Sequence, residues 1–227
     1  MARGEIVRRR ALLGMGLAAA ALPLAACEDE KDRAVAVYAL LDVSGSYFRE
    51  LDKAMRALRV MMGFVKAHDS FTVAEIAGCS FTDEAVLLRF TAPDRPSERQ
   101  RLVAASAARL ADYAAKARAT SYTDIRGALT QAVQQLSAKA AAQRTIVIFS
   151  DLEEELPPHC RREAPLPAGL RGCRVIAANV TRLPEDNRDP ARYARRLDGW
   201  RRLVEAAGAS WQVVGDPADL VAVLKDR

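Results

Sequence analysis

Three almost continuously apolar runs constrain the fold of this 227-residue chain more than any other feature. They span residues 34–41, 145–149 and 175–180, are rich in Ala, Val and Ile, and the last is interrupted only by Asn179. Runs of this length and composition are typical of strands buried on both faces of a parallel sheet. Parallel strands need crossover connections, usually helices, so the runs predict an α/β fold.

Helical periodicity between the runs supports this prediction. Apolar residues recur at steps of three and four in two segments, which places each set on one face of a helix that can pack on a sheet. The expected helices cover residues 51–65 and 193–207. The two sets are Leu51, Met55, Leu58, Met62 and Val65, and Tyr193, Leu197, Trp200, Val204 and Ala207. We therefore expect a doubly wound, mostly parallel central sheet with helices on both faces.

One edge of the sheet is expected to be antiparallel. The segments 71–77 and 85–91 both read as strands, and the connection between them contains Gly78 and Asp83. This connection is too short for a crossover helix, so the two strands should pair as a hairpin.

The first 26 residues resemble an export signal. Four arginines lie within the first ten residues, and an apolar stretch follows at 11–24. This stretch is shorter than the roughly 20 residues of a membrane-spanning helix. The sequence 24–27, Leu-Ala-Ala-Cys, resembles the lipobox of bacterial lipoproteins, which implies lipid modification of Cys27 and an exported domain anchored to a membrane, facing the periplasm or the cell exterior. An ordinary signal peptide with a chance cysteine is the alternative, and export through either the Sec or the twin-arginine route stays open.

Removal of residues 1–26 would leave 201 residues and lower the formal net charge from +5 to about +2. Residues 27–33 are polar and read as a tether, because they offer little apolar surface to bury. The remainder, 34–227, is long enough for one well-buried domain, and nothing in it indicates a second. The near-neutral charge and export both argue against a nucleic-acid partner.

Three short motifs with hydroxyl and carboxylate side chains follow the predicted strands or open a helix. They are Asp42-Val43-Ser44-Gly45-Ser46, Thr123 in the segment before a helix, and Ser150-Asp151. In open α/β sheets the ligand site lies beyond the carboxyl ends of the parallel strands, so these motifs should meet there. A site with only oxygen ligands suits Mg²⁺, or Mn²⁺ or Ca²⁺, better than zinc or copper.

In these residues the chain resembles a von Willebrand factor type A (vWA) domain with a metal-ion-dependent adhesion site. The family pattern is Asp-x-Ser-x-Ser after the first strand, a threonine before a helix and an aspartate after the fourth strand. The resemblance covers residues 34–225 and implies that Ser44 and Ser46 bind the cation directly. It also implies that Asp42, Thr123 and Asp151 act directly or through water, and that an acidic residue of a protein partner completes the coordination.

The residues around these motifs leave several alternatives open. Asp42 could cap a helix, Thr123 or Asp124 could cap the helix that follows, and the two serines could satisfy backbone donors in their turn, without any cation. Thr123 follows Ser121 and Tyr122, and Asp151 precedes Leu152, where the family often has glycines. The acidic segment 153–155 could be a solvated helix start, where acids offset the helix dipole, or could assist cation capture.

The favoured function is non-enzymatic protein binding, with two alternatives. A Mg²⁺-dependent phosphohydrolase also places an aspartate after the first strand, but its pattern has a second aspartate where this chain has Ser44. No glycine-rich phosphate loop with a lysine is present. A metal-free descendant of the vWA family is the other alternative.

Cysteine and arginine patterns give two further expectations. Cys160 and Cys173 bracket a proline-rich segment and are expected to form a disulfide, with Cys79 free; pairing of Cys79 with either of them is the alternative. Four arginines of the second predicted helix should form a basic face that is solvated or attracts acidic lipid or a partner. They are Arg192, Arg195, Arg196 and Arg202.

Overall fold

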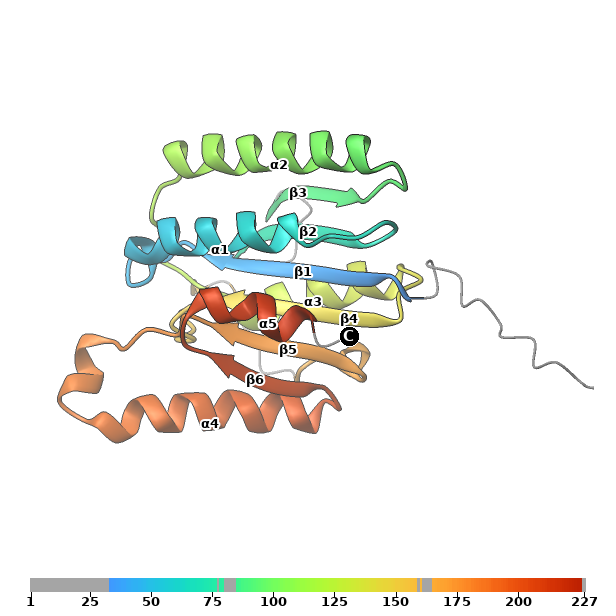
Figure 1. Ribbon diagram of the computed structural model, residues 1–227. Coiled ribbons are helices and arrows are strands. Elements are labelled where there is room, and N and C mark those ends of the chain that lie inside the picture. The colour runs from blue at the N-terminus through green and yellow to red at the C-terminus, as the bar shows by residue number, and fades with distance from the viewer. Residues whose placement is uncertain (1–32, 77, 80–84, 159, 161–164, 226–227) are drawn as a thin grey trace, which may run out of the picture.

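The computed structural model describes residues 33–76, 78–79, 85–158, 160 and 165–225. In this part of the chain one central sheet lies between two layers of helices (Figure 1). The strands are β1 (Val35–Asp42), β2 (Ser70–Ile76), β3 (Val86–Thr91), β4 (Gln143–Phe149), β5 (Cys173–Ala178) and β6 (Ser210–Val214). The helices are α1 (Leu51–Gly63), α2 (Pro96–Lys116), α3 (Ile125–Ser137), α4 (Pro190–Ala206) and α5 (Leu220–Lys225), with short 3₁₀ turns at Phe48–Glu50, Ala168–Leu170, Pro184–Asn187 and Pro217–Asp219.

The sheet confirms the predicted fold class. Its six strands run in the order β3-β2-β1-β4-β5-β6, and every neighbouring pair is parallel except β2 and β3. The chain moves from β1 outward to β3 on one side and then returns to β4 on the other side. The order of the strands therefore reverses between β1 and β4, which is where such sheets bind ligands.

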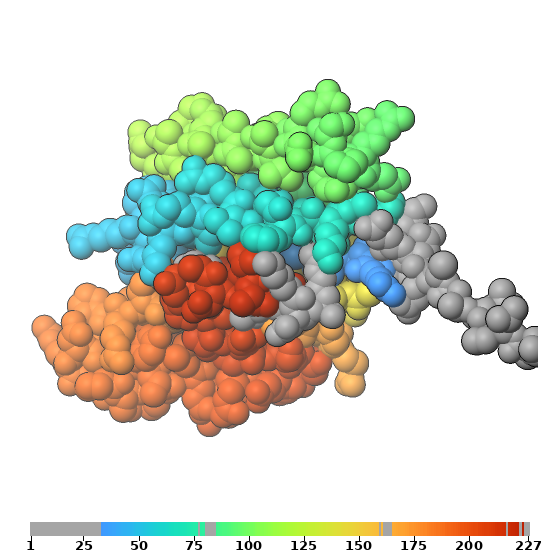
Figure 2. All heavy atoms as spheres, in the orientation of Figure 1, coloured from blue at the N-terminus to red at the C-terminus, as the bar shows by residue number. Residues whose placement is uncertain are grey.

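Each face of the sheet has its own hydrophobic core. On one face α1, α2 and α5 cover side chains such as Leu41, Val73 and Phe149. On the other face α3 and α4 cover Tyr38 and Ile148. Figure 2 shows α5, in red, packed between α1 and the α4 side of the molecule. Among the described residues, the side chains of both cores lie between residues 36 and 224.

Both helices predicted from periodicity are present, and three further elements are found that the sequence did not indicate. These are α2, β6 and α5. Among the 21 residues of α2, only Ser106 and Leu110 are fully buried, so its apolar stripe is too thin to stand out. In β6 only Val214 is fully buried. Elements at the periphery of the fold have a weak hydrophobic pattern because most of their residues are at least partly exposed to solvent.

The disulfide differs from the favoured prediction. Cys79 is bonded to Cys160, with their Cα atoms 6.2 Å apart, and Cys173 is a buried free thiol at the start of β5. The segment after β4 approaches the end of β2. A Cβ atom on Gly78 would lie 3.6 Å from the Cγ of Pro157, in that segment, and 3.0 Å from the Cβ of Tyr122, in the loop before α3. The favoured pairing of Cys160 with Cys173 is wrong because the sequence does not show how the segment after β4 runs. The alternative, in which Cys79 pairs with one of these two cysteines, is confirmed.

The expected signal segment, Cys27 and most of the tether lie outside the described residues. Among the helices that the structure describes, none is long and apolar enough to cross a membrane.

The bond between Cys79 and Cys160 should stabilise the domain because it closes a loop across 81 residues of chain. Changing both cysteines to serine should lower the free energy of unfolding by about 2–5 kcal/mol. Chemical denaturation under oxidising conditions, with peptide mapping of the bond by mass spectrometry, measures this loss. Cys173→Ser should not alter the mapped bond; a bond to Cys173 in the wild-type protein would contradict the assignment.

Candidate metal centre

The five predicted site residues belong to three segments near the carboxyl ends of β1 and β4. Asp42 ends β1, and Ser44 and Ser46 follow in the turn that leads to α1. Asp151 comes two residues after β4, the parallel neighbour of β1, with Leu41 in register with Phe149. Thr123 lies in the loop before α3. All but Ser46 are buried.

The buried carboxylate of Asp42 connects two of these segments. Its Oδ1 accepts a hydrogen bond from the Ser44 backbone N–H at 2.7 Å, and its Oδ2 accepts one from the Ser150 hydroxyl at 2.6 Å. Burial raises the pKa of Asp42 to about 6, against the lowering effect of these hydrogen bonds, and the negative charge of Asp151 adds to the increase. Asp42 therefore fixes the turn. A nearby cation would favour the ionised form of its carboxyl group.

The hydroxyls of Ser44 and Ser46 lie side by side, with their Oγ atoms 3.2 Å apart. Ser44 is 7% exposed whereas Ser46 is open to solvent. The pair thus reaches from the buried Asp42 to the surface. Two neutral oxygens in this position can both approach one ligand at the edge of the sheet.

Asp151 has one oxygen in use and one without a partner. Its Oδ1 accepts a hydrogen bond from the Glu153 N–H at 2.9 Å. Its Oδ2 is buried and has no hydrogen-bond partner among the described residues. A buried carboxylate oxygen without a donor is costly, and a bound cation would remove that cost.

Thr123 joins the group through its backbone. It exchanges two hydrogen bonds with Glu155, N to O at 2.7 Å and O to N at 3.1 Å, which fixes it beside the segment that follows Asp151. Three residues earlier, Thr120 binds the other segment: its N–H donates to the Val43 carbonyl and its carbonyl accepts from Gly45. The loop before α3 is therefore attached to both remaining segments. Asp124 caps α3 by accepting from the Gly127 N–H at 2.8 Å, as one of the alternatives anticipated.

The turn after Asp151 has a strained backbone that α4 holds in place. Leu152 has φ +65°, a conformation that residues other than glycine rarely adopt. Trp200 donates from Nε1 to the Leu152 carbonyl at 2.9 Å, and Arg196 donates from Nε to the Asp151 carbonyl at 2.9 Å. The Ser150 hydroxyl accepts from the Leu152 N–H. These bonds fix a turn that the family often makes with glycine.

Two of the sequence interpretations are wrong in this region. The segment 153–155 does not begin a helix. Glu153 pairs with Arg192, and Glu154 pairs with Arg126 at 3.0 Å. Arg196 does not belong to a solvated basic face, because its side chain is 6% exposed and pairs with the fully buried Asp186 at 2.7 Å.

The remaining arginines of that face are also paired with acids: Arg195 with Asp189, and Arg202 with Asp198. Asp198 stands four residues before Arg202 in α4 and is visible in the sequence, whereas the partners of Arg192 and Arg196 come from outside that helix, where its spacing gives no indication.

A polar cluster beside the site was not predicted. Asn179, at the end of β5, has φ +52° and donates from its amide to the hydroxyl of Tyr47 and to Glu50. Lys53 donates to its side-chain oxygen at 2.6 Å. This cluster attaches the turn after Ser46 to β5. The only hint in the sequence is a polar residue inside an apolar run.

These residues fit a hard divalent cation. The available donors are two hydroxyls, one free carboxylate oxygen and the carboxylate of Asp42, all oxygens. The described residues contain no group of three or more His, Cys, Asp or Glu side chains that could hold a metal. The predicted set has only two carboxylates, so neutral hydroxyls supply the rest of its side-chain donors.

No protein-family model and no curated protein matches this chain. Solved structures do match over most of it. Manganese-loaded TRAP protein of Plasmodium vivax is 15% identical with a TM-score of 0.52, over 85% of this chain and 72% of that one. A von Willebrand factor type A protein of Catenulispora acidiphila is 15% identical with a TM-score of 0.51, over 86% and 42% of the two chains. BatB of Bacteroides thetaiotaomicron is 16% identical with a TM-score of 0.50, over 84% and 96%.

At these identities the likeness shows the fold alone. The strand order, the antiparallel edge and the helices on both faces are those of a vWA domain.

The raised pKa of Asp42 predicts a pH effect on the metal-free protein. The pKa is about 6 in the folded chain against an ordinary 3.8, so between these values the unfolded chain gives up a proton that the folded chain keeps. Stability from this group is therefore lost as pH rises, by up to about 3 kcal/mol. Asp42→Asn has no titrating carboxyl and should not show this loss; its side-chain oxygen can accept from the Ser44 N–H, and its amide can donate to the Ser150 hydroxyl, which reverses that hydrogen bond.

Denaturation in chelator, at a pH near 4 and at a pH near 7, tests this effect. The difference in unfolding free energy between wild type and Asp42→Asn should shift in favour of the variant at the higher pH. Asp52→Asn, which changes an exposed carboxylate of α1, serves as the control. An unchanged difference for Asp42→Asn would show that this carboxyl titrates normally.

Proposed function

We propose that this chain is an exported, lipid-anchored vWA-type domain that binds a protein partner through a divalent cation, and that it is not an enzyme. The cation is Mg²⁺, or Mn²⁺ or Ca²⁺ in its place. Ser44 and Ser46 bind it directly, while Asp42, Thr123 and Asp151 complete or orient its ligands. The observation that carries the proposal is the buried Oδ2 of Asp151, which has no hydrogen-bond partner among the described residues; Asp151 follows β4, the parallel neighbour of the strand that leads to the two adjacent serine hydroxyls.

The chemistry of the ligands supports binding to an acidic group. Neutral hydroxyls reduce the charge of a cation very little, and Mg²⁺ takes six oxygens in nearly octahedral geometry. A bound cation would have an open coordination position at the exposed end of the site, beside Ser46. An Asp or Glu side chain of the partner offers the matching negative oxygen.

The chain's own residues keep this site in one arrangement. The Asp42 carboxylate holds the turn that carries both serines, and the Thr123 loop bridges that turn to the segment after Asp151. Arg196 and Trp200 fix the backbone of the Asp151 turn from α4. A preorganised set of donors loses little entropy when the cation and the partner bind.

The manganese-loaded TRAP protein shows that a vWA-fold neighbour can carry a divalent cation. Together with the sequence motif, this supports the cation proposal for the present chain.

Anchoring through Cys27 would keep the domain close to a membrane. The tether of residues 27–33 spans at most about 25 Å when extended. Fractionation of cells that express wild type or Cys27→Ser tests the anchor: the variant should leave the membrane fraction, and its retention there would contradict lipid attachment.

Cation binding should stabilise the folded domain. At a Mg²⁺ concentration about 100 times the dissociation constant, the expected gain in unfolding free energy is about 2.7 kcal/mol. Ser44→Ala removes a direct ligand and should weaken binding by at least about tenfold, roughly 1.4 kcal/mol. Calorimetric titration of Mg²⁺ and Mn²⁺ measures both effects. Ser137→Ala, an exposed serine of α3, is the matched control, and equal affinity in both variants would remove the serine from the site.

Partner capture tests the function itself. Membrane extracts are passed over immobilised wild type and Ser44→Ala, each in Mg²⁺ and in chelator. We expect a protein that is retained only by wild type in Mg²⁺. A protein retained equally under all four conditions would contradict the role of the cation and favour the metal-free alternative.

A further inference from the structure

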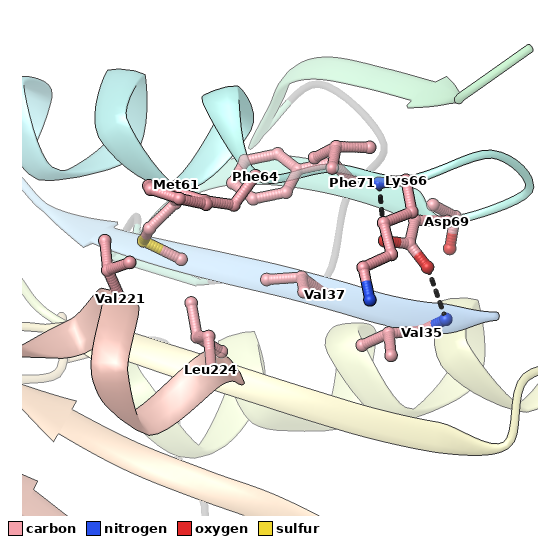
Figure 3. Close-up of a pocket in the computed structure, with 11 residues that line it drawn as sticks. Val35, Val37, Met61, Phe64, Lys66, Asp69, Phe71, Val221 and Leu224 are labelled. Carbon is pink, nitrogen blue, oxygen red and sulfur yellow. Dashed lines mark hydrogen bonds between the residues drawn. The ribbon is translucent and has the colours of Figure 1, made fainter. Parts of the chain in front are cut away.

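A cavity of about 280 Å³ lies at the amino ends of β1 and β2, at the opposite end of β1 from the candidate metal centre (Figure 3). It is enclosed by the first residues of β1 and β2, the end of α1, and α5. Its walls are mainly apolar: Val35, Val37, Met61, Phe71, Val221 and Leu224. Val35 and Asp42 are at opposite ends of β1, about 23 Å apart at strand spacing, so the two sites are separate.

The polar groups of the cavity have different roles. The carboxylate of Asp69 is 4% exposed and accepts hydrogen bonds from the backbone N–H groups of Val35 at 2.8 Å and Lys66 at 2.9 Å. It therefore holds the turn before β2 against the start of β1. The Lys66 ammonium has no hydrogen-bond or ion-pair partner among the described residues. Figure 3 shows the Lys66 side chain extending over β1 toward Val37 and Val35.

The mouth of the cavity also exposes an aromatic side chain. Phe64, at the end of α1, is 43% exposed and lines the cavity. Large apolar side chains exposed beside an apolar cavity are typical of ligand sites. An apolar ligand that filled the cavity would cover this ring and remove both surfaces from water.

We propose that the cavity binds a single-chain anionic amphiphile of medium length, such as a linear carboxylate. Its chain lies between β1, α1 and α5, and its head pairs with Lys66. The volume is just below the range of about 300–1,000 Å³ for drug-sized ligands, which suits one chain and not a two-chain lipid. The carboxylate of Asp69 is buried and its two oxygens accept backbone hydrogen bonds, so the exposed charged group of the cavity lining is the Lys66 ammonium, which favours an anionic head.

Titration of decanoate and decanol into the domain of residues 28–227 tests this site, because the two ligands share a chain and differ in the head. Isothermal calorimetry is carried out in chelator and below the concentrations at which the ligands self-associate. We expect saturable binding with one site per chain, about tenfold tighter for decanoate than for decanol. The use of chelator separates this result from the proposed cation site.

Three variants assign the binding to the cavity. Lys66→Met alters an exposed side chain and should remove the preference for decanoate while leaving decanol binding unchanged. Val221→Trp fills the cavity from α5 and should abolish binding of both ligands. Val213→Trp, at a 39% exposed position of β6 outside the cavity, is the matched control and should bind both as wild type does. Absence of saturable decanoate binding to wild type, or a decanoate preference that survives in Lys66→Met, would overturn the proposal.

Discussion

The hydrogen bond between Ser150 and Asp42 is the contact on which the site depends. It joins the carboxyl ends of β1 and β4, the two strands between which the sheet order reverses. The same carboxylate accepts from the N–H of Ser44. The position of the serine turn is therefore set by a fully buried acid at the carboxyl end of an inner strand. The strands β1 and β4 thus determine where the hydroxyls of Ser44 and Ser46 lie, because the turn that carries these serines is hydrogen-bonded to Asp42.

Two features of this arrangement lower the stability of the folded chain. Asp42 is desolvated strongly enough that its pKa rises to about 6, and Leu152 adopts a left-handed backbone. Conformations of this kind cost about 1–3 kcal/mol and persist where surrounding contacts fix them, often at functional sites. Here Trp200 and Arg196 supply the contacts, and Arg196 is itself held by the buried Asp186. Helix α4 therefore serves as a support for the Asp151 turn as well as a cover for the sheet.

The sequence predicts the centre of the molecule better than its edges. Strands β1, β4 and β5 are apolar on both faces, so their pattern is unmistakable, and the motifs after β1 and β4 locate the site. The thin apolar faces of α2 and β6 give no comparable signal.

Long-range side-chain pairings were the least predictable. The Cys79–Cys160 bond depends on how the segment after β4 approaches the end of β2, which no local pattern encodes. Arg196 illustrates the same limit, because helical spacing placed it with exposed arginines and only the path of the preceding turn brings Asp186 to it. The convergence of Asp42, Ser44 and Ser46 was predictable because β1 leads directly into their turn.

The two ends of β1 have different chemistry. At its carboxyl end are hydroxyls and carboxylates that suit a hard cation and an acidic partner, and at its amino end is an apolar cavity with one unpaired ammonium among the described residues. The cation is the central claim, and diffraction from crystals grown with Mn²⁺ tests it most directly. The account predicts an anomalous manganese peak beside the hydroxyls of Ser44 and Ser46 and the free oxygen of Asp151. A map without a peak at that place, from crystals in which Mn²⁺ is abundant, would contradict it.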